Sequence, residues 1–500
     1  MNRSSSTPPW DDTLRQAMHA QADRDYERAV TLYRELLHQY PFLSRAAYNL
    51  GNIYKETGQY ETAEVCFRQA LAAEPDLFEA AQNLAFTLQE QGKLSEAAQL
   101  YQQIVLRWPG LPDPRFSLAC LQLLRGDLAN GWTGYESRFE CLVNPVPRRH
   151  SDLPRWDGDP AQPLRLLLHT EQGFGDTLQM SRYLPLLAAT GISTILETDT
   201  ALAPLFARSA QLTDCIIRGC SLPSVDAQLP LMSLPGLFRT SLETIPPPAL
   251  PEPDPALVAQ FDRQLPKQTA LRIGLCWSGR LDLPVNRKRS CPVEQVRRLL
   301  AAPDCCFISL QTTAAPEFNL TDPRLLDLTA ALHDFHATAA LIASLDLVIS
   351  IDTAVAHLAG SMGKPVWLLV PFVPDWRWLL ERDDSPWYPS MRLFRQPSRG
   401  AWEQVIGTVL AELTFLGNAP AEALTNKGAL LGEHGRHTEA LRCYNEALLY
   451  RSDIAVTQYN RGNSLSALGC IQEARNAWHR ALQLNPRLVE AWHNLAISHR

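Results

Sequence analysis

Residues of the same type recur every 34 positions near the start of this 500-residue chain. The recurring residues are three alanines, three aromatics and three prolines: Ala29, Ala63 and Ala97; Tyr33, Phe67 and Tyr101; Pro41, Pro75 and Pro109. Small residues let two antiparallel helices approach closely, aromatic residues fill the gap between them, and a proline ends the second helix. The period therefore predicts a stack of helix pairs.

Residues 47–75 show the pattern most fully and resemble the tetratricopeptide repeat. The matching residues are Leu50, Gly51, Tyr54, Ala63, Phe67, Ala70 and Pro75. A degenerate fourth unit is expected at residues 113–135, so we assign an N-terminal repeat array to residues 10–145. Repeats of this kind mostly present a groove to a peptide or protein partner, and we expect such a partner here.

The same register returns near the C-terminus, where a second array is expected at residues 418–500. Its matching residues are Gly428, Ala440, Tyr444 and Ala447, then Gly462, Ala474, Trp478, Ala481 and Pro486. Trp492 and Leu495 open a further unit that has only its first helix. A capping helix and a fragment of a longer protein both explain this, and we favour the fragment because caps usually have a more polar outer face.

Between the arrays, short apolar runs alternate with helical stretches, which is typical of parallel α/β units. Strands are expected at residues 165–169, 193–197, 214–218 and 225–229, and again at 272–277, 306–310, 347–351 and 366–370. Six prolines in residues 246–255 form a stiff connector. We therefore expect two Rossmann-like domains at 156–245 and 268–415, a linker at 246–267, and a ligand cleft at the carboxyl ends of the strands.

The composition argues against several classes of protein. A net charge of −7 gives no support to nucleic-acid or anionic-membrane binding. The sequence has no apolar run of about 18 residues that would span a bilayer, and its first residues lack the apolar core of a secretory signal. The 11 cysteines form no CxxC pair and are expected to be reduced thiols in the cytoplasm.

A glycine-rich turn, Gln-Gly-Phe-Gly-Asp at residues 172–176, follows the first expected strand. It is not the dinucleotide fingerprint, because Leu178 stands where the third glycine is required. Asp176 has two interpretations. It is a general base that takes a proton from an acceptor hydroxyl, or it is a helix-capping residue that stabilises the fold by about 1 kcal/mol.

Ser278 and Gly279 end the first strand of the second half, and a basic run follows at Arg287, Lys288 and Arg289. Adjacent cations beside a Ser-Gly turn suit a diphosphate, to which arginine gives two hydrogen bonds at once. A solvated basic loop is the alternative, and such loops are the commoner case.

Residues 350–360 contain the most informative segment of the chain. A buried strand ends at Asp352 and Thr353, and a helix of small residues begins. Either residue can cap that helix, whose free N–H groups and positive end suit a phosphate. His357 follows Thr353 by four residues, so both are expected on one side of the helix. A plain strand-to-helix joint is the alternative, but we favour an anion site.

Two further groups are expected to be structural. Trp376, Arg377 and Trp378, with the later Trp387 and Tyr388, form an aromatic segment that can stack on a sugar or a base. We expect most of these residues to pack the helix at 401–413 across the domains instead. The acidic pair in residues 157–159 looks like a metal-binding DxD, but it precedes the first strand, so we expect no metal site there.

Three motifs stand in the order of a known family: EQGFGDTLQMSRYLPLL, GLCWSG with NRKRS, and IDTAVAHLAGSMGKPVWLLVP. Residues 156–415 thereby resemble a GT-B glycosyltransferase of the heptosyltransferase-like family nine class, in the form found in bacterial tetratricopeptide proteins. The resemblance implies tetratricopeptide α-solenoids that flank a GT-B module of two Rossmann-like domains. It also implies an inverting transfer from a nucleotide-diphosphate sugar, without a metal or another cofactor.

The resemblance further implies the role of each residue in the site. Asp176 is the general base. The remaining candidates bind the donor: Gly173, Gly175, Ser278, Gly279, Lys288 or Arg289, Asp352, Thr353 and His357. The first half shows no basic cluster for a phosphorylated lipid-sugar acceptor, which leaves a protein gathered by the repeats as an acceptor beside a glycan or a lipid-linked one.

Two other functions fit the same sequence. One is a non-catalytic scaffold for protein–protein interaction, with repeats around a degenerate transferase fold. The other is a different nucleotide-sugar enzyme, such as an epimerase, which leaves the diphosphate bond intact.

Overall fold

A computed structural model of the chain describes residues 8–143, 145–159, 164–266, 271–279, 288–313, 316–418 and 421–498. The chain divides into two compact units, Met1–Val146 and Pro147–Arg500.

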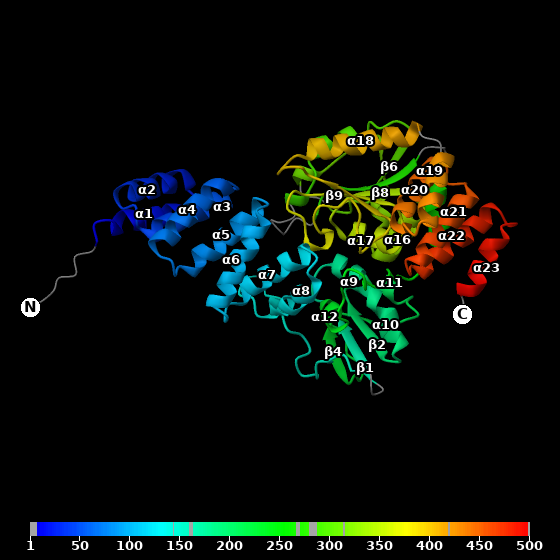
Figure 1. The fold of residues 1–500 in the computed structure, drawn as a ribbon, viewed down its shortest axis with the longest axis horizontal. Helices are drawn as coiled ribbons and strands as arrows, with labels where there is room; N and C mark the ends of the chain where they lie inside the picture. The colour runs from blue at the N-terminus through cyan, green and yellow to red at the C-terminus, as the bar shows by residue number, and fades with distance from the viewer. Residues whose placement is uncertain are drawn as a thin grey trace, which may run out of the picture. The chain divides into compact units, whose positions relative to one another are not determined.

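The first unit is a stack of antiparallel helix pairs, as the 34-residue period predicts (Figure 1). Its helices are α1 (Asp11–Ala22), α2 (Tyr26–Gln39), α3 (Ser44–Glu56), α4 (Tyr60–Ala73), α5 (Phe78–Glu90), α6 (Leu94–Arg107), α7 (Pro112–Leu124) and α8 (Leu128–Tyr135), followed by the 3-10 helix η1 (Glu136–Phe139). The degenerate fourth unit is the pair α7 and α8. Gly58, Gly92 and Gly126 turn the chain between paired helices with φ of 76°, 77° and 84°, where a side chain would be strained.

The second unit contains two parallel sheets, as expected. The first sheet has the order β3–β2–β1–β4, with strands β1 (Arg165–His169), β2 (Ser193–Thr198), β3 (Asp214–Ile217) and β4 (Ala227–Pro230). The second has the order β10–β9–β8–β5–β6–β7, with strands β5 (Leu271–Cys276), β6 (Cys305–Ser309), β7 (Leu325–Asp327), β8 (Leu347–Ile351), β9 (Val366–Val370) and β10 (Met391–Arg395). Counted within that sheet, the order is the 3-2-1-4-5-6 of a doubly wound nucleotide-binding fold.

The strands β7 and β10 were absent from the sequence prediction. Both lie at an edge of the second sheet. The strand β7 has only three residues, and β10 alternates buried apolar residues with Arg392 and Arg395, so neither is a continuous apolar run.

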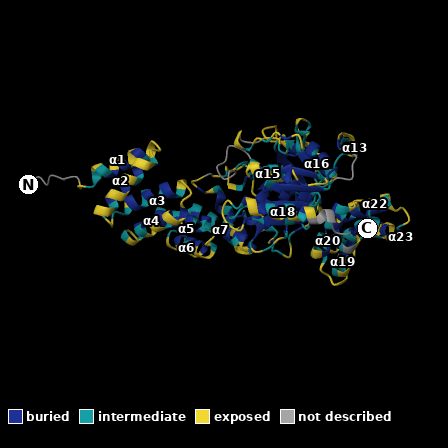
Figure 2. Ribbon diagram, turned by 90° about the horizontal axis from the view of Figure 1, so that it is seen from above, coloured by how far each residue is buried: buried dark blue, intermediate teal, exposed yellow. Residues whose placement is uncertain are grey.

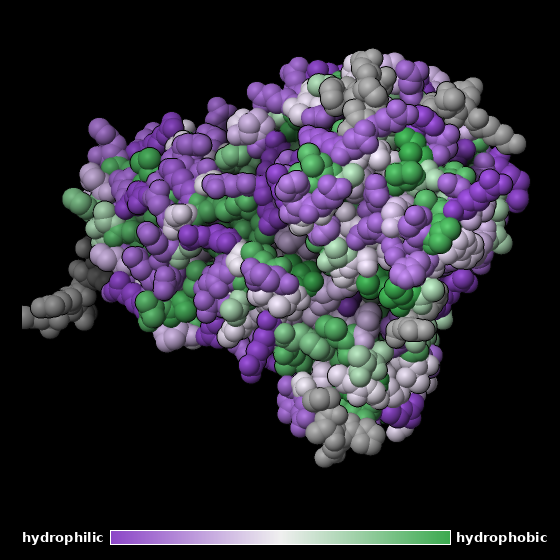
Figure 3. Space-filling model, turned by 45° about the vertical axis from the view of Figure 1, so that its right-hand side comes forward, coloured by the Kyte–Doolittle hydropathy of each residue, from purple (hydrophilic) through white to green (hydrophobic). Residues whose placement is uncertain are grey.

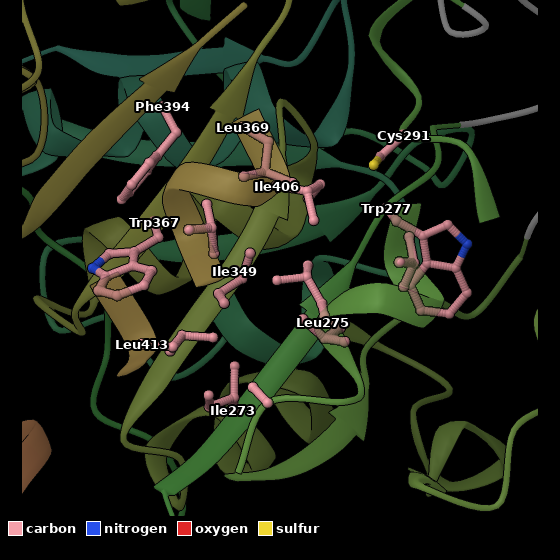
Figure 4. Packing of buried hydrophobic residues seen from close by; sticks show 14 of the residues in the cluster. Ile273, Leu275, Trp277, Cys291, Ile349, Trp367, Leu369, Phe394, Ile406 and Leu413 are labelled. Carbon is pink, nitrogen blue, oxygen red and sulfur yellow. The ribbon is translucent and has the colours of Figure 1, made fainter. Parts of the chain in front are cut away.

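Apolar side chains from the second sheet and from covering helices form a continuous core (Figure 4). Figure 1 shows α18 (Trp402–Asn418) on one side of this sheet and α16 (Phe335–Ala343) with α17 (Ala354–Ser361) on the other. Strand residues Ile273, Ile349 and Leu369 pack in the cluster with Val296 of α15 (Val293–Leu299) and with α18. Each fully buried aliphatic side chain contributes about 1.5–3 kcal/mol, so this core fixes the strand ends that carry the candidate site.

Shorter helices complete the part of the second unit around the first sheet. They are α9 (Phe174–Met180), η2 (Ser181–Tyr183), α10 (Leu184–Ala189), α11 (Ala203–Phe206), η3 (Leu231–Ser233) and α12 (Leu234–Leu237). Three more 3-10 helices lie in loops of the second sheet: η4 (Pro316–Phe318), η5 (Thr329–Ala331) and η6 (Trp376–Trp378).

The expected linker is not extended throughout. Residues Pro255–Gln264 form helix α13, because Pro255 occupies the first helical position and the Asp254 carboxylate accepts the Ala256 N–H at 2.8 Å.

The C-terminal array consists of α19 (Ala421–Glu433), α20 (His437–Tyr450), α21 (Ala455–Ala467), α22 (Ile471–Leu484) and α23 (Val489–Ser498). It packs on the part of the second unit that carries the second sheet. Leu449 and Tyr450 of α20 join the core of that sheet, and the Arg461 guanidinium of α21 donates to the Gly363 carbonyl after α17.

The repeat signature has the packing that its residue types predict. A Cβ added at Gly51 would lie 2.7 Å from the Phe67 ring, and one added at Gly428 would lie 2.6 Å from the Tyr444 ring. A Cβ added at Gly462 would lie 2.4 Å from the Trp478 ring. In each pair the aromatic residue stands 16 positions after the glycine, so one contact defines the register in both arrays.

The surface is ordinary for a globular chain. Figure 2 shows buried strands inside helices whose outer faces are exposed, and Figure 3 shows hydrophilic residues interspersed with hydrophobic ones on the face drawn. No helix in the described ranges has the length and apolar character needed to cross a bilayer.

Candidate functional site

The two helices that begin at the predicted motifs lie side by side. Helix α9 follows strand β1 of the first sheet, and α17 follows strand β8 of the second (Figure 1). A Cβ added at Gly175 would lie 2.6 Å from His357 Cδ2, so the glycine is required for this close approach. Gly175, Asp176 and His357 therefore belong to one site at the carboxyl ends of the two sheets.

Asp176 is not the N-cap of α9, as one interpretation of the sequence had it. The N-cap is Gly173, with extended backbone at φ −73° and ψ 167°, and Asp176 stands three residues later. Its Oδ2 accepts the Gly173 N–H at 2.7 Å. The carboxylate therefore closes the first turn of its own helix.

Arg377 holds the other oxygen of Asp176. Its Nη2 donates to Asp176 Oδ1, its Nε to Gln179 Oε1 at 2.7 Å, and its Nη1 to Asp375 Oδ1 at 2.7 Å. The guanidinium lies 4.1 Å from the centre of the Trp376 ring and is 7% exposed. Arg377 thus joins the second sheet's side of the site to α9.

The sequence contained a signal for Arg377. It stands between two tryptophans in the loop that follows β9, whose carboxyl end belongs to the same edge as the other motifs. The neighbouring aromatics are buried, as expected, but they pack around the site. Arg182 Nη1 donates to the Trp387 carbonyl at 3.0 Å, and its guanidinium lies over the Trp387 and Tyr388 rings.

The start of α17 differs from that of α9 because its first turn contains no carboxylate. Thr353 is the N-cap, with φ −142° and ψ 169°, but its side chain does not cap the helix. Its hydroxyl lies 3.1 Å from Ser350 Oγ and 3.6 Å from Cys276 Sγ instead. The N–H groups of Ala354 and Val355 have no intrahelical acceptor and no partner among the described residues, which makes this end suitable for an anion.

Asp352 is buried between the Arg289 guanidinium and the His357 imidazole. Its Oδ2 lies 3.4 Å from Arg289 Nη1, and its Oδ1 lies 3.7 Å from His357 Nε2. Burial would raise the pKa of the Asp352 carboxyl, but the nearby His357 imidazole and the charge of Arg289 outweigh it and hold the pKa below its usual range. Asp352 is therefore a carboxylate that fixes Arg289 beside α17.

His357 does not share an open side of α17 with Thr353. Its ring is 3% exposed and stacks on Trp378, with the ring centres 5.3 Å apart. Its Nδ1 lies 2.8 Å from the Tyr388 hydroxyl, and its other nitrogen faces Asp352. The imidazole is therefore a buried packing residue of the site, held by Trp378 and Tyr388.

The Ser278–Gly279 turn lies beside Thr353, since β5 and β8 are neighbours in the sheet. The Trp277 and Ser278 N–H groups both donate to Gln311 Oε1, at 3.0 and 2.8 Å. The Gly279 N–H donates to Ser290 Oγ at 3.3 Å. The side chain of Gln311, which the sequence gave no reason to select, thus occupies the place where a phosphate oxygen would meet this turn.

Of the two cations proposed for the diphosphate, Arg289 reaches the site through Asp352, and Lys288 is exposed. The rest of the basic loop, including Asn286 and Arg287, lies outside the described residues.

A pair of arginines gathers at the carboxyl end of β1, where the sequence showed no basic cluster. Arg149 Nη1 and Arg218 Nη2 both donate to the Thr170 carbonyl at 3.0 Å. The pair was missed because its members are 69 positions apart in the sequence. The buried Glu197 at the end of β2 pairs with Arg149, and burial lowers the pKa of the neighbouring His169 to about 4.

The acidic pair at 157–159 closes a local turn, in which Asp157 Oδ1 accepts the Asp159 N–H at 3.1 Å. Within the described ranges, no three His, Cys, Asp or Glu side chains are grouped to hold a metal ion.

Comparisons with known proteins identify the repeats. Models of the tetratricopeptide repeat match residues 12–76, 48–112 and 455–488. Protein FlbA of Caulobacter vibrioides is 31% identical over 330 residues, which cover 60% of this chain and 54% of FlbA. That match is longer than either repeat array and so extends into the α/β region. A small glutamine-rich tetratricopeptide repeat-containing protein of Dictyostelium discoideum is 36% identical over 74 residues, covering 15% of this chain and 22% of that protein.

The chain thus spans about half the length of FlbA and less than a quarter of the length of the Dictyostelium protein. Among solved structures, the repeats are similar to YrrB, a tetratricopeptide protein with an unusual peptide-binding site, at 21% identity and a TM-score of 0.24, covering 26% of this chain and 66% of YrrB. A MamA structure matches at 15% identity and a TM-score of 0.25, covering 26% of this chain and 72% of that one. The chain carries tetratricopeptide repeats at both ends, around a Rossmann-like α/β region with two parallel sheets.

Proposed function

We propose that the α/β region is a GT-B glycosyltransferase that moves a sugar from a nucleotide-diphosphate donor to an acceptor hydroxyl, with inversion and without a metal. The observation that carries this proposal is the contact of Gly175 with His357. That contact places the start of α9, with its carboxylate, against the start of α17, which no side chain among the described residues caps.

The donor diphosphate binds at the start of α17. The N–H groups of Ala354 and Val355 donate to it, and the positive end of the helix favours its charge. Arg289, held 3.4 Å from Asp352, supplies a fixed positive charge, so that no metal is needed to neutralise the leaving group. The Ser278 turn contacts the donor once the Gln311 side chain moves aside.

The acceptor oxygen attacks the anomeric carbon on the face opposite the diphosphate. The new carbon–oxygen bond forms as the bond to the diphosphate breaks, and the nucleoside diphosphate leaves with the electron pair. The acceptor proton passes to the Asp176 carboxylate, the general base. The base comes from the first sheet's side and the donor site from the second, so both sides have to meet for turnover.

The acceptor is a glycan, a lipid-linked sugar or a protein, and the repeats bind a protein or peptide partner. Arg149 and Arg218 at the carboxyl end of β1 restore a basic group on the acceptor side, although Glu197 and Asp199 partly neutralise it. The free cysteines suit a reducing compartment, and we place the reaction in the cytoplasm.

A non-catalytic scaffold is the second candidate, and one observation favours it. Both Asp176 oxygens accept hydrogen bonds from the protein, and Gln311 fills the turn after β5. If these hydrogen bonds keep ligands out of the site, the α/β region is a degenerate transferase fold without activity, and the repeats carry the function of the chain.

Ligand-induced stabilisation separates the two candidates. The thermal unfolding of the full chain is followed with UDP, GDP, ADP and CDP in the presence of EDTA, and then with the corresponding nucleotide-sugars. A diphosphate at about 100 times its Kd adds about 2.7 kcal/mol of stability. Stabilisation together with sugar release supports the transferase, stabilisation without turnover supports the scaffold, and an intact diphosphate bond with an altered sugar supports an epimerase.

Two variants locate the diphosphate. Arg289→Met is expected to weaken the stabilisation by the diphosphate, because this guanidinium is held at the start of α17. Lys288→Met tests the neighbouring cation, which is exposed, and is expected to leave the stabilisation nearly unchanged. The opposite ranking would move the diphosphate away from α17.

A further inference from the structure

Arg377 joins the two sides of the candidate site more extensively than any single motif residue does. It lies in η6, between β9 and β10 of the second sheet, yet two of its acceptors lie on α9. Those acceptors, Asp176 and Gln179, are three positions apart, so they lie on one face of that helix. The guanidinium therefore binds two side chains on one turn of α9.

The orientation of Arg377 is fixed because its neighbours in the loop after β9 also contact the guanidinium. Asp375 accepts from Nη1 at 2.7 Å, and the plane of the guanidinium lies 4.1 Å from the Trp376 ring centre. A planar guanidinium with donors in three directions fixes orientation as well as charge, which a lysine ammonium does not. Its burial, at 7% exposure, protects these bonds from water.

The hydrogen bonds of Asp176 restrict its carboxylate to one orientation. The Gly173 N–H holds Oδ2 from within α9, and Arg377 holds Oδ1 from the opposite side. Each carboxylate oxygen has a further lone pair, so the group still accepts a proton while it is held. Without Arg377, the carboxylate would keep only its contact within its own helix.

We infer that Arg377 is a positioning residue for the proposed transfer: it fixes the Asp176 carboxylate relative to the donor site when the two sides meet. The inference rests on the proposed function. Its consequence is that Arg377 acts through Asp176, and a misplaced catalytic group costs up to about 100-fold in rate.

The variant that tests this role is Arg377→Lys, which keeps a positive charge and loses the planar fork. Its matched control is Arg382→Lys, since Arg382 makes a similar two-donor pair with Asp384, at 2.6 and 2.8 Å, without a described bond to α9. Turnover is followed as hydrolysis of the UDP-, GDP-, ADP- or CDP-linked sugar that stabilises the wild-type chain most, because water replaces an unidentified acceptor. The Kd of the matching nucleoside diphosphate is measured by calorimetry.

Arg377→Lys is expected to lower kcat about 10–100-fold and to change the Kd of the diphosphate less than about twofold. In an Asp176→Asn background the same substitution is expected to have almost no further effect, because residues that act as a unit are not additive. Arg382→Lys should leave kcat and Kd close to wild type.

Three results would overturn the inference: a multiplicative effect in the Asp176→Asn background, a loss confined to the Kd of the diphosphate, or an unchanged kcat in Arg377→Lys. The first two would make Arg377 a donor ligand. If Arg377→Lys unfolds, Gln179→Leu removes one of the same acceptors and is subject to the same test in the Asp176→Asn background. A wild-type chain that binds no diphosphate and hydrolyses no donor refutes the proposed function itself, which is a different outcome from an active enzyme with an indifferent Arg377.

Discussion

The starts of helices α9 and α17 have similar local structure, but their aspartates make different contacts. Each follows a buried parallel strand, begins from an extended residue, and has an aspartate close by. In α9 the aspartate stands inside the first turn and accepts the Gly173 N–H of that turn. In α17 it stands one residue before the cap and turns away to Arg289 and His357.

The difference shows that the position of a carboxylate relative to the cap decides what a helix start can bind. Asp176 satisfies part of its own helix start and places negative charge there, so α9 is unsuited to a phosphate. Asp352 lies outside the first turn of α17 and pairs with the Arg289 cation, and in the described part of the chain no side chain caps this helix start. In the proposed transferase, a base on α9 would therefore not compete with an anion bound at α17.

The largest expected effect follows from replacing the carboxylate of α9. Asp176→Asn keeps an oxygen for the Gly173 N–H but removes the proton acceptor, so the transfer or donor-hydrolysis rate should fall about 10²–10⁴-fold. Steady-state rates and the Kd of the nucleoside diphosphate are the measurements.

The same variant also challenges the comparison of the two helix starts. If the diphosphate Kd falls strongly while the rate changes little, Asp176 belongs to the donor site, and the division between base and anion pocket is wrong. The melting temperature of Asp176→Asn provides the check that the fold persists.

The next effect concerns stability at the other helix start. Asp352→Asn leaves the half-buried Arg289 and the buried His357 without their carboxylate. The free energy of unfolding at pH 7 should fall by roughly 3 kcal/mol, the lower end for a broken buried pair, because Arg289 still reaches solvent. Asp262→Asn is the matched control, since this half-exposed carboxylate pairs with Arg272 at 3.1 Å and is worth about 0–1 kcal/mol. Urea unfolding measures both.

The Asp352 effect has a definite dependence on pH. The folded pKa lies below the unfolded value of about 3.9, so the stabilisation is fully present above the unfolded pKa and is lost as pH falls through the folded one. The stability difference between wild type and Asp352→Asn should therefore be constant from pH 7 to about 5 and shrink below about 4. A difference that grows on acidification would contradict a low folded pKa.

Local patterns in the sequence predicted most of the architecture. The 34-residue recurrence of alanine, aromatic and proline residues predicted the repeats, and the apolar runs predicted the buried strands. The edge strands β7 and β10 were not predicted, because an edge strand has one neighbour and needs no continuous apolar run. Helix α13 was not predicted, because it lies in the segment whose prolines indicate a linker.

The candidate site was predicted less completely, since its partners meet only in three dimensions. The motif positions Asp176, Asp352 and His357 do come together, but the bonds that set their roles come from Arg377 and Tyr388. Those two residues were read as parts of an aromatic packing segment. Burial among tryptophans hid an arginine whose partners stand about 200 positions earlier, at separations of 201 and 198.

A smaller effect is expected where the two helix starts touch. Gly175→Ala places a Cβ 2.6 Å from the His357 ring, which Trp378 and Tyr388 hold in place, so α9 and α17 must separate. Overpacking of this kind costs about 1–3 kcal/mol, and kcat should fall with it. Gly173→Ala is the matched control, because its Cβ would lie 3.4 Å from Asp176 Oδ2 and its φ of −73° suits alanine. Equal losses of melting temperature and rate in the two variants would show that the two helices do not meet at Gly175.

The smallest effect separates a helix cap from an anion pocket. Asp334, the N-cap of α16, accepts the Ala337 N–H at 2.7 Å, so Asp334→Ala should cost about 1 kcal/mol. Thr353 caps α17 by position alone, and Thr353→Ala should cost less than about 0.5 kcal/mol, as for a substitution without such a role. Denaturant unfolding of the two variants gives this ranking, and a nucleoside diphosphate should still stabilise Thr353→Ala, since the N–H groups that bind it belong to Ala354 and Val355. A large loss of unfolding free energy in Thr353→Ala would mean that the Thr353 hydroxyl caps α17. A variant that the diphosphate no longer stabilises would mean that this hydroxyl binds the ligand. Either result would weaken the contrast between the two helix starts.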